Sequence, residues 1–304
     1  MSYLTNHLIK ILLKTPGNKI VNQDMNEWND EIVPKRNLFH VNLYEIIQYK
    51  DLLFLFVKRD FISLYKQTIL GPLWFFIQPI LTTLIFTVVF GRIAGISTDG
   101  LPQILFYLAG ITCWNYFSEC LTKTSNTFIE NQNIFGKVYF PRLIIPLSIV
   151  CSSLLKFGIQ FLLFLIVFFY YFFKADHNIN PNIFILLFPI LILLTGLLSL
   201  GIGILITSLT TKYRDFRFLI QFGIQLWMYA TPIIYPLSTL DGKLKTTAIM
   251  NPMSSIIETF KFGFLGQGTF SWYYLGYTAI FTFLILIIGI LIFNKTEQNF
   301  MDTV

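Results

Sequence analysis

Residues 65–81 read YKQTILGPLWFFIQPIL and join a charged segment to an apolar one. Positions 58–66 hold four charged residues, whereas no charged residue occurs from Leu73 to Phe90. Glycine ends helices at little cost, and proline suits the first turn of the next helix because that turn needs no N–H from it. Trp74 follows with an amphipathic ring, which favours the depth of lipid headgroups. The stretch therefore predicts a surface helix, a bend at Gly71-Pro72, and a second helix that enters a membrane.

The composition of the chain is that of an integral membrane protein. Of its 304 residues, 55% are hydrophobic and 12% are charged, and the mean hydropathy is +0.65. Soluble domains carry about a quarter charged residues. The net charge of +6 comes from dispersed basic residues, without the clustered lysines, arginines and stacking rings of a nucleic-acid surface. We therefore expect membrane lipids, and no nucleic acid, as partners.

The residue pattern also argues against an enzyme. The three cysteines and three histidines lack metal-ligand spacing, and no two carboxylates share an apolar segment where a general acid and base could face each other. The phosphate loop G-x-x-x-x-G-K-[ST] is missing. We expect no catalytic residue, no metal site and no cofactor in this chain, and an energy source, if any, comes from elsewhere.

Six apolar segments come near or exceed the ~20 residues with which a helix crosses a bilayer. They are Leu73 to Phe90, Ile104 to Leu121, Ser153 to Phe173, Ile183 to Leu209, Phe218 to Tyr235 and Trp272 to Phe293. An even number of crossings places both termini on one side, and the bias of lysine and arginine marks that side as cytoplasmic. The predicted fold class is an all-α membrane protein with six transmembrane helices.

Two further segments are predicted to lie at the membrane surface or to dip into it. Residues 41–66 never run more than six residues without a charge, which favours an interfacial amphipathic helix; an ordinary solvated helix is the alternative. Met253 to Leu265 is apolar but too short to cross, which favours a re-entrant or interfacial helix between the fifth and sixth spans. Glu258 and Lys261 within it have the spacing of a helical ion pair.

Lys156 lies inside the third apolar segment, where a lysine at the bilayer centre costs about 2.5–3.5 kcal/mol. A helix from Leu143 to Phe173 would measure ~46 Å, longer than the ~30 Å hydrocarbon core. If the bilayer begins near Ser153, Lys156 can extend to the cytoplasmic headgroups. A functional lysine inside the membrane is the alternative.

Aromatic residues gather in the external halves of the second and fifth segments. Sugars stack their apolar faces on aromatic rings and bond their hydroxyls to ring edges, so these side chains could line a glycan path. For any one of them, an anchor facing lipid is an equal alternative. The residues are Trp114, Tyr116, Phe117, Trp227, Tyr229 and Tyr235.

Four stretches in the same order resemble the polysaccharide-export branch of the type-two ABC exporter permeases, the group that handles O-antigen, teichoic acid and capsule. They are FVKRDFISLYKQTILGPLWFFIQPILTTLIFTVVFG (56–91), NQNIFGKVYFPRLIIPLS (131–148), KYRDFRFLIQFGIQLWMYATPIIYP (212–236) and NPMSSIIETFK (251–261). The likeness extends from about Leu52 to the C-terminal EQNFMDTV, and residues 1–40 fall outside it.

The resemblance implies a homodimer in a bacterial cytoplasmic (inner) membrane, served by two separate ATP-binding subunits that bind ATP and Mg. The implied cargo is polysaccharide on polyprenyl pyrophosphate. O-antigen is the first expectation, teichoic acid or capsule is the alternative, and a drug or small-lipid exporter of the same architecture is a further rival. The implied domains are an N-terminal cytoplasmic extension (1–40), the interfacial helix (41–70) and a six-span permease domain (71–304).

The resemblance also implies sites. In such permeases a coupling helix after the second span docks on the ATP-binding subunit, and it maps here to about residues 126–139. The residues expected at this surface are Asn126, Glu130, Asn131, Asn133, Ile134, Phe135, Lys137, Tyr139 and Arg142, with a second contact at Lys212, Arg214 and Asp215. Lys58, Arg59 and Lys66 would lie where the lipid pyrophosphate arrives. Attraction to anionic headgroups, with a role in topology, is the alternative for these three.

Overall fold

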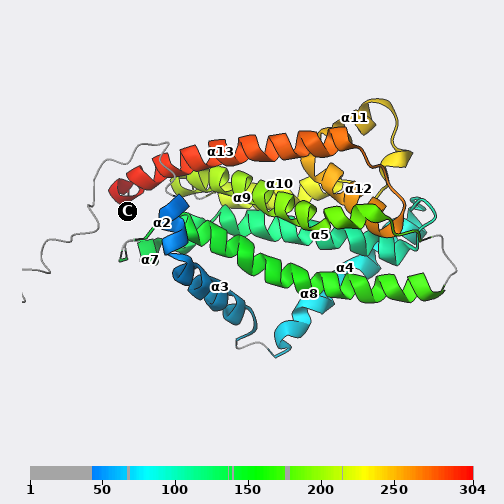
Figure 1. Ribbon diagram of the computed structural model, residues 1–304, viewed down its shortest axis with the longest axis horizontal. Coiled ribbons are helices and arrows are strands. Elements are labelled where there is room, and N and C mark those ends of the chain that lie inside the picture. The colour runs from blue at the N-terminus through cyan, green and yellow to red at the C-terminus, as the bar shows by residue number, and fades with distance from the viewer. Residues whose placement is uncertain are drawn as a thin grey trace, which may run out of the picture. The chain divides into compact units, whose positions relative to one another are not determined.

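The computed structural model describes residues 43–66, 69–135, 137–138, 140–174, 179–213 and 215–303, and Figure 1 shows it as a ribbon. Every regular element in these ranges is helical, so the predicted all-α class is confirmed. The predicted N-terminal extension (1–40) lies outside the described residues.

The predicted bend is present. α2 (Leu43–Gln48) and α3 (Lys50–Tyr65) precede it, and the 3-10 turn η1 (Gly71–Leu73) leads into α4 (Trp74–Phe86), which continues as the π-helix η2 (Thr87–Ile93). Gly71 has a φ of +52°, which residues with a Cβ rarely adopt, and Pro72 occupies the first turn. The Trp74 side chain is 50% exposed. Local backbone chemistry therefore sets the change of direction.

α3 lies against the long helix α8 (Ile144–Lys174), as Figure 1 shows. The buried Phe56 of α3 packs in a cluster with Phe140 and Ile145. Phe54 and Leu55 are exposed and point away from that cluster. α3 thus presents one apolar face to the protein and further apolar side chains to its surroundings, next to the exposed Lys58. An interfacial location for α3 stays a prediction.

α5 (Gln103–Thr124) is the central helix of the body. It packs against α4, α8, α9 (Phe188–Lys212), α10 (Phe216–Tyr229) and α12 (Pro252–Leu265), and 15 of its 22 residues are buried. One of its polar side chains bonds to a neighbouring helix: Asn115 Nδ2 donates to Gln160 Oε1 of α8 at 3.3 Å. Because neighbours cover it, α5 needs no continuous apolar surface.

Glycines let α9 approach two other helices closely. A Cβ at Gly289 of α13 (Trp272–Thr303) would lie 2.6 Å from the carbonyl oxygen of Gly201. A Cβ at Gly203 would lie 2.6 Å from the Cβ of Thr124 on α5. Small residues permit such backbone contact between membrane helices, where the hydrophobic effect drives little association. α9, preceded by the 3-10 turn η3 (Ile183–Leu187), is therefore held between α5 and α13.

α12 is a short, enclosed helix. The chain reaches it from α10 through the 3-10 turn η4 (Leu237–Thr239) and α11 (Gly242–Met250), and 12 of its 14 residues are buried. Asn251 Oδ1 accepts the N–H of Met253 at 3.1 Å, which caps the first turn. At the other end, Asn182 donates from N to the carbonyl of Gly263 at 3.0 Å and from Nδ2 to that of Phe262 at 2.9 Å. Both ends of α12 are thus satisfied inside the protein.

Four helical segments are long and apolar enough to cross a membrane. They are Gly71–Ile93, Ile144–Lys174, Ile183–Lys212 and Trp272–Thr296, and they match four of the six predicted spans. α5 misses the criterion because it is more polar, and α10 misses it because it has 14 residues and ends at Tyr229 instead of Tyr235. The integral membrane class is supported, and crossings by α5 and α10 stay predictions.

Candidate functional site

The segment predicted as a coupling helix consists of two short helices, α6 (Thr127–Glu130) and α7 (Gln132–Phe135), near α2 (Figure 1). The fully buried Phe128 holds it: the ring centres of Phe135 and of Phe293 on α13 lie 5.6 and 4.8 Å away. The Arg142 guanidinium lies 5.5 Å from the centre of the Phe135 ring. The segment is therefore a packed element, with its position set by α13 and the start of α8.

Hydrogen bonds join this segment to the last turn of α9 and the first turn of α10. Thr210 Oγ1 donates to the carbonyl of Ser125 at 2.7 Å, and Arg217 Nε donates to Asn126 Oδ1 at 3.0 Å. These bonds connect residues that are 85 and 91 positions apart in the chain. The structure thus brings the two predicted docking contacts together into one surface, which we call the loop platform (125–142 and 210–217).

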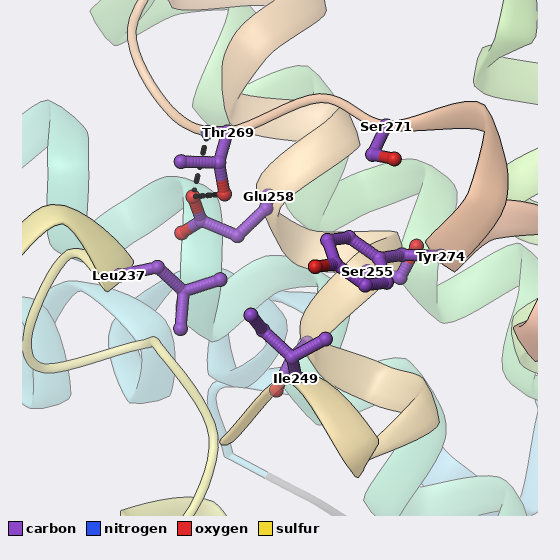
Figure 2. Close-up of a pocket in the computed structure, with 8 residues that line it drawn as sticks. Leu237, Ile249, Ser255, Glu258, Thr269, Ser271 and Tyr274 are labelled. Carbon is purple, nitrogen blue, oxygen red and sulfur yellow. Dashed lines mark hydrogen bonds between the residues drawn. The ribbon is translucent and has the colours of Figure 1, made fainter. Parts of the chain in front are cut away.

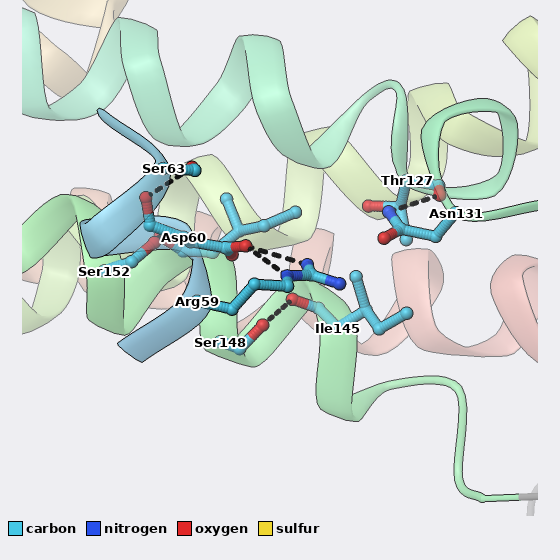
Figure 3. Close-up of polar contacts among 9 residues, drawn as sticks. Arg59, Asp60, Ser63, Thr127, Asn131, Ile145, Ser148 and Ser152 are labelled. Carbon is cyan, nitrogen blue, oxygen red and sulfur yellow. Dashed lines mark hydrogen bonds and ion pairs between the residues drawn. The ribbon is translucent and has the colours of Figure 1, made fainter. Parts of the chain in front are cut away.

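The predicted docking residues differ in exposure. Glu130, Asn133, Lys137, Lys212 and Asp215 are exposed, Ile134 and Arg142 are half-buried, and Asn126, Asn131 and Phe135 are buried. Tyr139 and Arg214 lie outside the described residues. The buried residues shape the platform: Asn131 Nδ2 donates to the carbonyl of Thr127 at 3.0 Å (Figure 3). The exposed residues are the ones that a partner could contact.

The predicted basic residues of α3 are all exposed, but they are not equivalent. The Arg59 guanidinium pairs with the neighbouring Asp60 at 2.7 Å (Figure 3). It also lies 4.7 Å from the centre of the Phe56 ring. Asp60 therefore offsets the charge of Arg59. Lys58 and Lys66 extend from the surface of α3 and from its C-terminal end.

A second charged group lies at the last turns of α5. The two carboxylate oxygens of Glu119 each pair with one lysine ammonium group: Oε1 with Lys123 of the same helix at 2.8 Å, and Oε2 with Lys156 of α8 at 2.7 Å. Lys156 is 17% exposed and pairs with Glu119, and its extension to the cytoplasmic headgroups stays a prediction. The spacing of Glu119 and Lys123 was visible in the sequence. Their third partner was not, because it comes from another helix.

The six predicted glycan-path aromatics separate into three places. Trp114 and Phe117 are buried, with their ring centres 5.3 Å apart, and Phe117 meets the half-buried Trp227 of α10 edge to face at 5.2 Å. Tyr116 is buried against α8, where its ring centre lies 5.2 Å from that of Phe157. At the end of α10, the half-buried Tyr235 donates to the carbonyl of the exposed Tyr229 at 3.2 Å. Of the six, Tyr229 presents the most side-chain surface.

Glu258 and Lys261, predicted as an ion pair within α12, each bond to a residue outside α12. Glu258 Oε2 accepts the N–H of Thr269 at 3.0 Å, beside a cavity of about 10 Å³ that has room for one water molecule (Figure 2). Lys261 Nζ donates to the carbonyl of Pro232 at 2.7 Å and lies 3.5 Å from the centre of the Phe106 ring. Both side chains are fully buried. Each ionisable group therefore connects α12 to a different neighbouring segment.

Comparison with known proteins decides the family. The family model described as ABC-2 type transporter matches residues 51–265. The chain belongs to the ABC-2 type transporter family. The family resemblance expected from the sequence is confirmed.

Relatives of this ABC-2 transporter chain include named polysaccharide transport proteins. The O-antigen export system permease protein RfbA of Klebsiella pneumoniae is 28% identical over 253 residues, which cover 83% of this chain and 94% of that protein. RfbA of Myxococcus xanthus is 26% identical over 219 residues, 71% of this chain and 81% of that protein. The polysialic acid transport protein KpsM of Escherichia coli is 21% identical over 250 residues, 81% of this chain and 93% of that protein.

Proposed function

We propose that this chain is the permease subunit of an ATP-driven exporter that moves polysaccharide linked to polyprenyl pyrophosphate across a bacterial cytoplasmic (inner) membrane. One observation carries the proposal: the likeness to an O-antigen export permease extends over 83% of this chain and 94% of that relative. O-antigen is the cargo that we propose first, because the capsule relatives are more distant, at 20–21% identity. Teichoic acid and capsule are the alternatives.

Six crossings with both termini in the cytoplasm follow if α5 and α10 span together with the four apolar segments. The 22 residues of α5 make a helix of ~33 Å, enough for the ~30 Å hydrocarbon core, and its neighbours shield its polar residues from lipid. The 14 residues of α10 make ~21 Å, so this crossing needs the chain up to Tyr235. α12 is then a re-entrant helix, whose backbone ends have the protein partners that membrane depth requires.

The proposed partner at the loop platform is a separate ATP-binding subunit, which binds ATP and Mg. Two copies of this chain and two of the partner would form the exporter. The platform suits transmission of force because it is bonded to α9 and α10 and packed on α13 through Phe128. Movement of the exposed Asn133 or Lys137 would therefore also move α9, α10 and α13. ATP-driven closure of the two partner subunits would move the platforms and in this way open a path between the two permease copies.

The cargo path is proposed to lie between the two copies, with α10 on its wall. Tyr229 and Trp227 are the aromatics that we propose contact sugars, since they retain exposed surface on α10. The ring of the buried Phe117 packs against that of Trp227, and the ring of Trp114 packs against that of Phe117. Lys58, Arg59 and Lys66 are proposed to lie where the lipid pyrophosphate arrives, with Asp60 reducing the contribution of Arg59.

Deleting the gene in its host tests the proposed function. Surface polysaccharide should disappear and lipid-linked polymer should accumulate inside the cell, and a plasmid copy should reverse both changes. Sugar analysis of the surface and of the extracted lipid measures the effect and identifies the polymer. An unchanged surface polymer with altered tolerance to drugs would favour the rival, an exporter of small molecules.

A further inference from the structure

The charged cluster of Glu119, Lys123 and Lys156 has an unbalanced charge. One carboxylate faces two ammonium groups, at 2.8 Å from Lys123 and 2.7 Å from Lys156. The side chains are partly withdrawn from water, with exposed fractions of 15%, 33% and 17% in that order. Positive charge outside bulk water interacts strongly with any anion that reaches it. These three side chains therefore carry one excess positive charge, and Glu130 is the next carboxylate whose charge interacts with Lys123.

Both lysines have hydrogen-bond donors left for such an anion. An ammonium group has three N–H donors, and the Glu119 carboxylate engages one lysine on each of its two oxygens. The other contact of Lys156 is the Phe75 ring, whose centre lies 5.6 Å from Nζ. An aromatic face attracts a cation but leaves its N–H groups available to oxygen acceptors nearby. An anion can thus bond to Lys123 and Lys156 while Glu119 keeps their spacing.

The cluster lies at the depth of lipid headgroups in the proposed topology. Lys123 is in the last turn of α5, at the end that leads into the loop platform. Phe75, against which Lys156 lies, is the second residue of α4, directly after the bend at Gly71-Pro72. The half-exposed Trp74 beside it has the ring that favours headgroup depth. The anions available at this depth are lipid phosphates.

We propose that Lys123 and Lys156 bind the diphosphate headgroup of a lipid from the cytoplasmic leaflet, and that Glu119 positions both lysines and competes with the lipid for them. The inference rests on the proposed function, which supplies a lipid with a diphosphate. A diphosphate carries more charge than the phosphodiester of a bulk lipid, and its oxygens can reach two ammonium groups. Lys58 and Lys66 of α3 would then act earlier, where the lipid approaches.

Binding of a short-chain polyprenyl diphosphate to the purified full-length chain in detergent tests the site. Lys123→Gln and Lys156→Gln should each weaken binding about tenfold, because each loses a charge-assisted hydrogen bond. Lys156→Arg should bind like the wild type, and Lys243→Gln, an exposed lysine of α11, is the matched control that should change nothing. Glu119→Gln should strengthen binding, because it raises the excess charge from one to two.

The sign of the Glu119→Gln effect separates this site from a structural ion cluster. If the cluster serves only to hold α5 to α8, all three neutral variants lower the unfolding temperature and none changes the affinity, which would overturn the proposal. Equal affinity for phosphatidylglycerol, for inorganic pyrophosphate or for a polyprenol without phosphate would overturn the assignment to a diphosphate lipid. The two proposals can fail separately. If binding depends on the two lysines but deletion of the gene leaves surface polysaccharide unchanged, the site is supported and the proposed polysaccharide exporter is contradicted.

Discussion

Lys261 is a cation in the interior of the chain, and its position depends on two partners from distant segments. Its Nζ donates to the Pro232 carbonyl at 2.7 Å and lies over the Phe106 ring. Lys261→Met keeps the aliphatic volume but leaves that buried carbonyl unpaired, so the free energy of unfolding should fall by about 1–3 kcal/mol. The unfolding temperature in detergent measures this. Lys243→Met, at an exposed position of α11, should change it little, and equal effects would contradict the role of the hydrogen bond.

Phe128 anchors the loop platform through its ring. It is fully buried between Phe135 and Phe293, and truncation of such a ring leaves a cavity. We expect Phe128→Ala to cost about 3–5 kcal/mol of unfolding free energy. Phe54→Ala on α3 removes an equally large but 67% exposed ring and serves as the control. A similar loss of stability in both variants would show that burial of Phe128 is not the cause.

The contact between α9 and α13 depends on two glycines, Gly201 and Gly289, which have no side chain to separate the helices. A Cβ at Gly289 would lie 2.6 Å from the Gly201 carbonyl oxygen, so Gly289→Ala must separate the two helices and lower the unfolding temperature. Gly276→Ala on the same helix meets nothing within 4 Å and should be neutral or stabilising, because alanine favours helix more than glycine does. Thermal unfolding of both variants in detergent makes the comparison. A stable Gly289→Ala protein would mean that this pair of helices has room to move apart.

The loop platform offers a test of partner binding. Lys137 is exposed there, so Lys137→Glu reverses a charge without disturbing the buried Phe128 and Asn131. We expect weaker capture of the ATP-binding subunit in a pull-down, with unchanged unfolding temperature of the chain alone. Lys243→Glu, on α11, carries the same charge change and should leave capture intact. Full capture by the Lys137 variant would place the docking surface elsewhere.

The number of crossings decides on which side each loop lies. If α5 and α10 both cross, Asn133 on α7 is cytoplasmic and Lys243 on α11 is external. If α5 does not cross, Asn133 lies outside with the loop after α4. Single cysteines at these two positions, in a chain whose Cys113, Cys120 and Cys151 are replaced, should react with an impermeant thiol reagent on opposite sides. Labelling of intact cells and of inverted vesicles measures this. Reaction of the Asn133 position in intact cells would contradict the six-crossing topology.

Prediction from the sequence succeeded where the cause is local. The bend at Gly71-Pro72 follows from two residues whose backbone preferences act within one turn. The long segments Ile144–Lys174 and Ile183–Lys212 follow from hydropathy summed over neighbouring positions. Prediction was weakest for α5, because its exposure to lipid depends on what covers it. Hydropathy does not contain that information.

The amino-acid sequence by itself determined the helical class, the bend at Gly71-Pro72, four apolar segments long enough to cross a membrane and the ABC-2 family. Each depends on properties of contiguous residues or on motif order. Tertiary structure alone decided the bonds of Thr210 and Arg217 to the segment after α5, the burial of Trp114 and Phe117, and the pairing of Lys156 with Glu119. These contacts join residues on different helices, so their existence depends on how the helices pack against one another.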